Sequence, residues 1–455
     1  MPTRLRFCAL AAAVAGVVLC APRIAVAHAI GGGSDLPVPL EFFIIGAGLV
    51  LVLSFAALAV LWPRPRLQDG PSYEAGSLGV DVGRLRPILA ALGLFSLVLL
   101  IGQVVSPVLG IDMQAGRPTI APVTVWVAFW LVVPFAAVVI GDWYTDLNPW
   151  RSIGRYLGGE ERPAVLERWG VWPATVVFVA FTWLELVSPN SGEPVVLGLV
   201  ALGYTFLMLA AMAYAGRTTG LQTVDAFTTY NRLMSAISPL GRGDSGRLVW
   251  RGWLRSLPVI PEWPGLWVFV IATIGTVSFD GASGAGWFST ITGPLSNGIG
   301  GQTLLLVGSV VVVAMAYLGA CAVAARLSAD RRSAGAVVQR FAHTLVPVAL
   351  AYAFAHYFTL VIFEGQLMVS AISDPFGLGW DLFGTADRRV EFFITSADLI
   401  WYIQVASIVI GHVLGVVLAH DRALEDFGRD AVRSRYAMLA LMVGLTTLGL
   451  LILAG

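Results

Sequence analysis

The sequence has no lysine and few charged residues of any kind. Acidic and basic residues together make up 12% of the 455 positions, whereas a soluble domain carries roughly 25%. Hydrophobic residues make up 57%, and the mean hydropathy is +0.80. This composition excludes a soluble globular fold and a basic surface for nucleic acid. It predicts an all-α, polytopic bundle of transmembrane helices in the lipid bilayer.

Cysteine is also scarce, and its positions exclude a disulfide bond within the mature chain. Two of the three cysteines, Cys8 and Cys20, lie in residues 1–27, which we interpret as a cleaved signal peptide. A basic start, an apolar run and small residues before the cleavage position are typical of such a signal. Cleavage leaves His28 as the N-terminus of an exterior segment, 28–41. A shifted cleavage position and an uncleaved first helix are the alternatives.

Apolar runs long enough to cross roughly 30 Å of hydrocarbon recur ten times in the transmembrane domain, residues 42–455. The fourth and the sixth run are short and need flanking residues to complete a span. We therefore expect about ten spans. The runs cover residues 42–61, 87–108, 123–140, 172–186, 195–214, 266–279, 303–325, 341–363, 399–418 and 437–453.

The distribution of arginine predicts the orientation of these spans. Most of the 28 basic residues, all of them arginine, lie in loops on one side, including the long loops 141–171 and 215–265. Few lie in the opposite loops, of which 278–302 and 364–398 are the longest. Because basic residues stay on the cytoplasmic side, we place both termini outside. The expected location is the bacterial cytoplasmic membrane.

Some of the connecting segments are predicted to contain helices of their own. Residues 221–237 combine polar groups with aromatic and apolar residues, which predicts an amphipathic helix at the membrane interface. Loop 364–398 has apolar stretches and several acids, and we expect it to hold a surface or re-entrant helix. Glu185, near the outer end of the fourth span, is expected to reach the exterior.

Four of the five histidines lie in the eighth and ninth spans or at their ends. Ionisable groups at membrane depth are costly, and they are candidates for function. At a rise of ~1.5 Å per residue, His356 lies level with Gln404 and within a turn of Tyr402. By the same measure, His412 lies level with Tyr352. We expect these polar neighbours to support the two histidines.

The other two histidines of this group, His343 and His420, fall at the inner rim of the membrane. We expect them to face water there. Helix periodicity does not allow all four histidines to converge on one ion, because the two members of each span point in different directions around the helix.

Imidazole is a suitable ligand for copper, zinc and iron. We therefore predict a transition-metal site centred on His356 or His412 and completed by Glu364 or by another span. A free N-terminal His28 offers an amine and a ring nitrogen, which makes it a further candidate ligand. Hydrogen bonds between helices are the alternative role for the two central histidines. No other cofactor and no catalytic residue is predicted.

Four segments, 28–37, 141–150, 355–366 and 402–422, carry short motifs. Among them are His-Ala-Ile-Gly-Gly-Gly-Ser-Asp from position 28 and Ala-His-Asp-Arg from position 419. On these segments the chain resembles a family of polytopic membrane proteins common in actinobacteria, some of which are labelled fenitrothion hydrolase. The resemblance implies hydrolysis of organophosphate esters, a reaction that usually needs a metal-activated water at neutral pH.

Three functions remain open on the sequence. The first is binding or handling of a transition metal ion by an intramembrane histidine site. The second is membrane-embedded hydrolysis of an apolar ester that arrives from the lipid. The third is a structural or accessory subunit whose histidines only link helices. The sequence identifies no protein partner.

Metal content separates these functions. We expect detergent-purified protein to hold a stoichiometric amount of copper, zinc or iron, and we expect His356→Ala or His412→Ala to lower it, because each variant removes a ligand. Plasma mass spectrometry of the wild type and both variants measures this. Absence of metal after supplementation contradicts the metal hypothesis.

Overall fold

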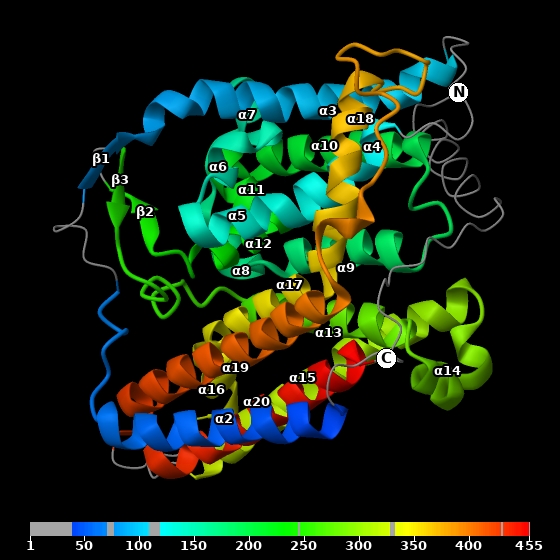
Figure 1. Cartoon of the computed structure of the whole chain (residues 1–455). Coiled ribbons are helices and arrows are strands. Elements are labelled where there is room, and N and C mark those ends of the chain that lie inside the picture. Colours follow the sequence, from blue (N-terminus) through cyan, green and yellow to red (C-terminus); the bar gives the residue numbers. More distant parts are fainter. Residues whose placement is uncertain are drawn as a thin grey trace.

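The protein forms a long helical bundle with a small β-sheet at one end and the short helix α14 at the opposite end (Figure 1). The structure is a computed structural model. It describes residues 39–70, 77–108, 119–243, 246–327, 333–428 and 431–454. The predicted signal peptide and His28 lie outside the described residues.

Long apolar helices dominate the described part of the chain, and they match the predicted runs closely. They are α2 (Leu40–Leu61), α3 (Arg86–Val108), α4 (Ile120–Pro122) continuing through η2 (Val123–Val132) into α5 (Val133–Ile140), α9 (Trp172–Leu186), α10 (Pro194–Ala215), α13 (Leu266–Ser283), α15 (Ile299–Arg326), α17 (Val346–Phe363), α19 (Ala397–Phe427) and α20 (Ala431–Leu453).

Shorter elements connect these helices. They are η1 (Val82–Leu85), α6 (Tyr144–Leu147), α7 (Pro149–Leu157), α8 (Pro163–Trp169), α11 (Arg217–Val224), α12 (Ala226–Ser235), α14 (Gly286–Thr292), η3 (Gly293–Ser296), α16 (Ala334–Phe341), η4 (Ala342–Leu345), η5 (Glu364–Gln366), α18 (Leu367–Ser373) and η6 (Phe392–Ile394).

The described part contains nine helices that are long and apolar enough to cross a membrane, and a tenth if α8 and α9 together form one bent span. The bend between these two helices is 66°. The polytopic helical bundle expected from the sequence is therefore confirmed in its coarse form, and the chain has the architecture of a multi-pass membrane protein.

The long helices pack in two groups. One group contains α2, α13, α15, α17, α19 and α20, and the other contains α3, α10, α9 and the continuous helix from α4 to α5. The groups meet where α13 packs on α9 and where α17 packs on η2. Each long helix is apolar around most of its circumference, so polar residues buried at the contact between the groups stand out against an apolar background.

A three-stranded antiparallel sheet links two connecting loops, a feature that an all-α prediction missed. Strand β3 (Arg247–Trp250) lies between β1 (Ser77–Asp81) and β2 (Leu240–Arg242), and Gly241 pairs with Val249. The strands are short, and β1 lies far from β2 and β3 in the sequence. Local hydrophobic periodicity therefore gave no signal for them.

Helices α11 and α12 correct a second expectation. They cover most of the predicted interfacial helix 221–237, but nearly all residues of α12 are buried, and α12 packs against α5 and α9. The polar and aromatic residues of this segment therefore face protein contacts instead of lipid headgroups.

The C-terminal part of α19 anchors the chain that follows α2. Asp421 is fully buried, and its carboxylate accepts four hydrogen bonds of 2.6–3.2 Å from a single short segment. The donors are Trp62 Nε1, Arg66 N, Leu67 N and Gln68 Nε2. Further along α19, Asp426 forms an ion pair with Arg340 of α16, with the closest atoms 2.6 Å apart.

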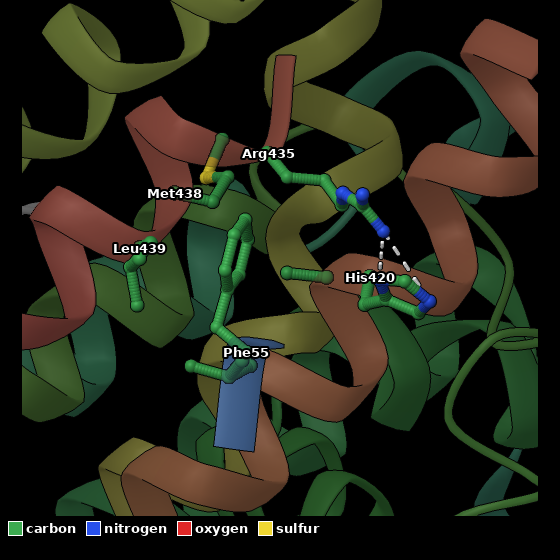
Figure 2. Close-up of a pocket in the computed structure, with 7 residues that line it drawn as sticks. Phe55, His420, Arg435, Met438 and Leu439 are labelled. Atoms are coloured by element: carbon green, nitrogen blue, oxygen red, sulfur yellow. Dashed lines mark hydrogen bonds between the residues drawn. The ribbon is translucent and has the colours of Figure 1, made fainter. Parts of the chain in front are cut away.

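His420 extends this anchor to α20, and Figure 2 shows its contact with Arg435. Its Nε2 donates to the Trp62 carbonyl at 2.8 Å, and its Nδ1 accepts a hydrogen bond from Arg435 of α20. His420 and His343 are both buried, so the expectation that they face water at the rim was wrong. Interhelical packing encloses this level of the bundle.

We expect Asp421→Ala to lower the free energy of unfolding by about 3 kcal/mol or more, because it leaves several buried donors without an acceptor. Hydrogen exchange in segment 62–68 should rise in the same variant. Thermal unfolding in detergent and mass-spectrometric exchange measure the two effects. The control is Glu425→Gln on the same helix, whose side chain is exposed. Equal behaviour of the two variants contradicts the anchor.

Candidate functional site

A buried carboxylate joins two adjacent side chains of α17 at the contact between α13 and α17. Asp280 Oδ2 lies 2.8 Å from His356 Nε2 and accepts a hydrogen bond of 2.8 Å from the Tyr357 hydroxyl. Asp280 is 8% exposed, and the His356 side chain is 20% exposed. A polar cluster is thus built inside the bundle and remains in contact with its surface.

The local sequence explains why these groups meet. Asp280 lies three residues before the end of α13, and His356 lies seven residues before the end of α17, which runs in the same direction as α13, so both occupy a similar depth. Gly281 allows the close approach. A Cβ at this position would lie 3.4 Å from His356 Nδ1 and would collide with Ile452 of α20.

Further polar atoms from three other elements lie close to this pair. Glu185 of α9 is within electrostatic range of Asp280 and Tyr357. Trp130 of η2 has its ring centroid 6.3 Å from that of Tyr357 and 5.1 Å from that of Tyr230 of α12. We call Glu185, Asp280, His356 and Tyr357, with Trp130 and Tyr230, the acid–base cluster.

Three atoms of this cluster are enclosed without a hydrogen-bond partner in the described part of the chain. They are Trp130 Nε1, Glu185 Oε2 and the Tyr230 hydroxyl. Leaving a buried polar group unpaired costs about 1–3 kcal/mol. Such a cost is common where a site binds water, ions or ligands. Glu185 is partly exposed while its Oε2 is enclosed, so the expectation that it reaches the exterior stays a prediction.

Trp130 is presented by an unusual backbone. The ten residues of η2 form a π-helix, and the N–H of Val133 bonds to the carbonyl of Ala128, five residues earlier. Pro134 follows and has no N–H, so it cannot form the α-helical bond to Trp130. π-Helical turns occur frequently at functional sites. Here the wider turn directs a fully buried indole toward the contact between the two helix groups.

The cluster has the elements of proton chemistry. A carboxylate that hydrogen-bonds to one imidazole nitrogen orients the ring and leaves the other nitrogen to accept a proton. In His356 that other nitrogen is Nδ1, beside Gly281. Two carboxylates in one enclosed region also influence each other's protonation. The arrangement can therefore bind, hold and release protons within the bundle.

The structure separates the other histidine from this cluster. His412 is fully buried, its Nδ1 lies 2.7 Å from the Ile408 carbonyl, and its Nε2 has no partner in the described residues. Its ring centroid is 5.8 Å from that of Tyr352, which agrees with their predicted common depth. The Tyr352 hydroxyl itself donates to the Leu445 carbonyl of α20.

The remaining supporting residues have mainly structural contacts. Gln404 Nε2 donates to the Ala355 carbonyl at 2.8 Å, which agrees with its predicted depth level with His356. Tyr402 is exposed and packs near Phe43 of α2. Glu364 is partly exposed in η5, and no described contact brings it to either central histidine.

This geometry gives limited support to the predicted transition-metal site. Among the described residues, no group of three or more histidine, cysteine, aspartate or glutamate side chains is arranged to hold a metal. His356 Nδ1 is the ring nitrogen not bonded to Asp280, so it is the atom most suited to a ligand role. The proposed ligand His28 lies outside the described residues.

A second buried acid, Asp225, lies outside the acid–base cluster and has several hydrogen-bond donors. Its carboxylate accepts hydrogen bonds of 2.8–2.9 Å from side chains of α6–α7, α10 and α12 and from its own helix start. Burial raises the pKa of Asp225 despite these bonds. Burial and the Asp225 charge also raise the pKa of Tyr144. The donors are Asn148 Nδ2, Tyr204 OH, Phe227 N and Thr228 Oγ1.

Sequence reasoning missed Asp280, Tyr357, Trp130 and Tyr230 as members of a site. Asp280 directly follows the apolar run 266–279 and Tyr357 follows His356, so both carried a weak signal. Nothing in the sequence indicates that α13 is the partner of α17. Comparisons of the chain with family models, curated proteins and solved structures found no match.

Asp225 predicts a pH dependence of stability. Because its folded-state pKa is raised, the folded protein binds this proton more tightly than the unfolded chain does. The stabilisation is present at low pH and is lost as the pH rises above the ordinary aspartate pKa of about 3.9. As the pH rises through this range, we expect the free energy of unfolding of the wild type to fall relative to that of Asp225→Asn. Denaturation in detergent at several pH values measures it.

The matched control is Glu160→Gln, which changes an exposed acid in the loop before α8. Its difference from the wild type should not vary with pH in the same way. A constant difference between wild type and Asp225→Asn across the range contradicts the assignment.

Proposed function

We propose that this chain is a proton-coupled transport protein of the bacterial cytoplasmic membrane and that His356 and Asp280 form its proton-binding pair. The observation that carries the proposal is the 2.8 Å contact between His356 Nε2 and Asp280 Oδ2, at the contact between the long helices α13 and α17. Acid and histidine groups at membrane depth are typical of proton relays in pumps and transporters.

The position of the pair supports uptake of protons from one side. His356 retains 20% exposure, and Asp280 and His356 both lie near the ends of their helices on the predicted exterior side. Tyr357 bonds to the same carboxylate oxygen. A proton that reaches His356 can therefore pass to Asp280 without a large movement of either side chain.

The unpaired atoms of Glu185, Trp130 and Tyr230 supply a route further into the bundle. They come from α9 and η2 of the second helix group and from the connecting helix α12. We propose that bound water connects these atoms to Asp280, because buried water typically makes about three hydrogen bonds to otherwise unpaired groups. Movement of the two helix groups relative to each other then couples protonation to transport.

The metal-handling function inferred from the sequence stays a prediction, and the structure supports it less than it supports proton chemistry. Proton chemistry needs only the groups that the cluster brings together. A metal site needs further ligands for His356 Nδ1, and the described residues contribute no such group of three.

Ester hydrolysis, the activity implied by the family resemblance, is the second candidate, and one observation favours it. A histidine oriented by a carboxylate is also a suitable general base. His356 Nδ1 can take a proton from a water that attacks an ester. Turnover of a chromogenic dialkyl aryl phosphate by the wild type, lost in His356→Gln, supports this alternative over transport.

The proposed function predicts a proton-binding band and proton flux that depend on Asp280. Infrared titration should show a carboxylic acid C=O signal that disappears in Asp280→Asn, because the amide cannot take up the proton. In proteoliposomes with a trapped pH dye and an imposed potential, flux should fall by at least about tenfold in this variant.

The control is Glu193→Gln, which changes an exposed acid just before α10 and should leave both signals unchanged. Size-exclusion elution verifies that each variant is folded. A wild-type infrared signal and flux that Asp280→Asn leaves intact contradict the proposal.

A further inference from the structure

A large apolar cavity lies on the other side of α9 and η2 from the acid–base cluster. Its volume is about 530 Å³, within the usual range of roughly 300–1,000 Å³ for small-molecule sites. Its walls come from α3, α10, α9, the continuous helix α4–η2–α5 and the connecting helices α6 and α7. Phe129 and Phe181 contribute to its inner wall.

The walls offer almost nothing to a polar ligand. The indole N–H of Trp143 donates to the Val133 carbonyl at 2.9 Å, and that of Trp150 donates to Thr205 at 3.0 Å. Ser96 donates to the carbonyl of Leu92. Because these groups are already paired, a polar ligand would lose its hydrogen bonds to water without replacement. An apolar ligand carries no such cost.

Hydroxyl groups near the cavity are also directed away from it. Tyr204 donates to Asp225 at 2.8 Å, and the Tyr144 hydroxyl lies 3.5 Å from the same carboxylate. Both tyrosines line the cavity, so they contribute ring carbon to its wall. The Asp225 carboxylate lies behind them and organises that wall without serving as a ligand.

The cavity reaches the lipid-facing surface of the bundle. Leu92 and Phe95 of α3 and Val132 of η2 belong to its lining and are 40–61% exposed. Helix α3 packs along α10 and against α4, α6 and α7, and Leu99 of α3 packs against the cluster that contains Val123 and Val127 of η2. The exposed lining residues on both elements indicate that the cavity opens laterally between α3 and η2.

The end of the cavity beneath the predicted exterior loop is lined by loop residues, of which Leu382 and Phe383 are 59% and 68% exposed. Met368 and Ile372 of α18 and Pro375 line it there. The Pro375 carbonyl accepts hydrogen bonds of 3.1 Å from Gln103 Nε2 and from Ile120 N. These bonds hold the loop against α3 and α4, so the lateral opening is the direct route for a molecule dissolved in the bilayer.

We infer that this cavity binds one acyl chain of a membrane lipid, which enters sideways between α3 and η2. The lining of α3 from Leu92 to Leu100 extends roughly 12 Å along the helix axis at 1.5 Å per residue, so the site is elongated as well as apolar. A flexible chain fits both properties, and the lipid headgroup remains outside. The inference is independent of the proposed transport function.

Photolabelling tests the inference on the full chain in bilayers. The probe is phosphatidylcholine with a diazirine in its acyl chain, and mass spectrometry locates the labelled peptides. We expect label to concentrate on cavity-lining residues of α3 and η2. The variants Ala201→Phe and Ala128→Phe fill the cavity from opposite walls, and each should lower this labelling by about tenfold through overpacking.

The matched control is Ala210→Phe, the same substitution on an exposed position of α10, which should retain the wild-type labelling. Use of two filling variants on different helices protects the test against misfolding of either one. Even labelling of all lipid-facing helices in the wild type overturns the inference, whatever the variants do. Labelling of the cavity by compact adamantyl diazirine but not by the lipid probe also overturns it.

Discussion

Hydrocarbon cannot replace the hydrogen bonds that a polar group loses when it leaves water, and this constraint organises the whole molecule. Asp421 and Asp225 satisfy it completely, because each carboxylate accepts several bonds from neighbouring segments. The acid–base cluster satisfies it only in part, since Glu185 and Trp130 keep unpaired atoms within the described residues. Full pairing marks acids that hold the fold, and incomplete pairing marks the region suited to exchange protons.

The contact between the two helix groups determines where both candidate sites lie. The π-helical η2 and the short α9 stand at this contact, and each contributes residues both to the acid–base cluster and to the wall of the apolar cavity. Phe181 lines the cavity while Glu185, one turn along α9, joins the cluster. The same two elements therefore separate a region of paired and unpaired polar atoms from one that is almost entirely carbon.

Sequence periodicity predicted much of the vertical arrangement. The run 87–108 is observed as α3 at Arg86–Val108, and 172–186 is observed as α9 with the same limits. The helical rise placed Gln404 level with His356, and the hydrogen bond from Gln404 to the Ala355 carbonyl agrees with that depth. It could not identify Asp280 as the partner of His356, because the two residues are 76 positions apart and helix rise carries no information about lateral neighbours.

By itself, the sequence determined the helical bundle and the depth of its polar residues, because apolar run length and helical rise are local properties. Only the tertiary structure decided which acids meet a histidine, which histidines are enclosed and where a cavity remains. Those outcomes depend on how helices pack side by side, and packing depends on the shapes of many residues distant in sequence. His420 illustrates this difference, because its depth followed from the sequence while its burial between Trp62 and Arg435 did not.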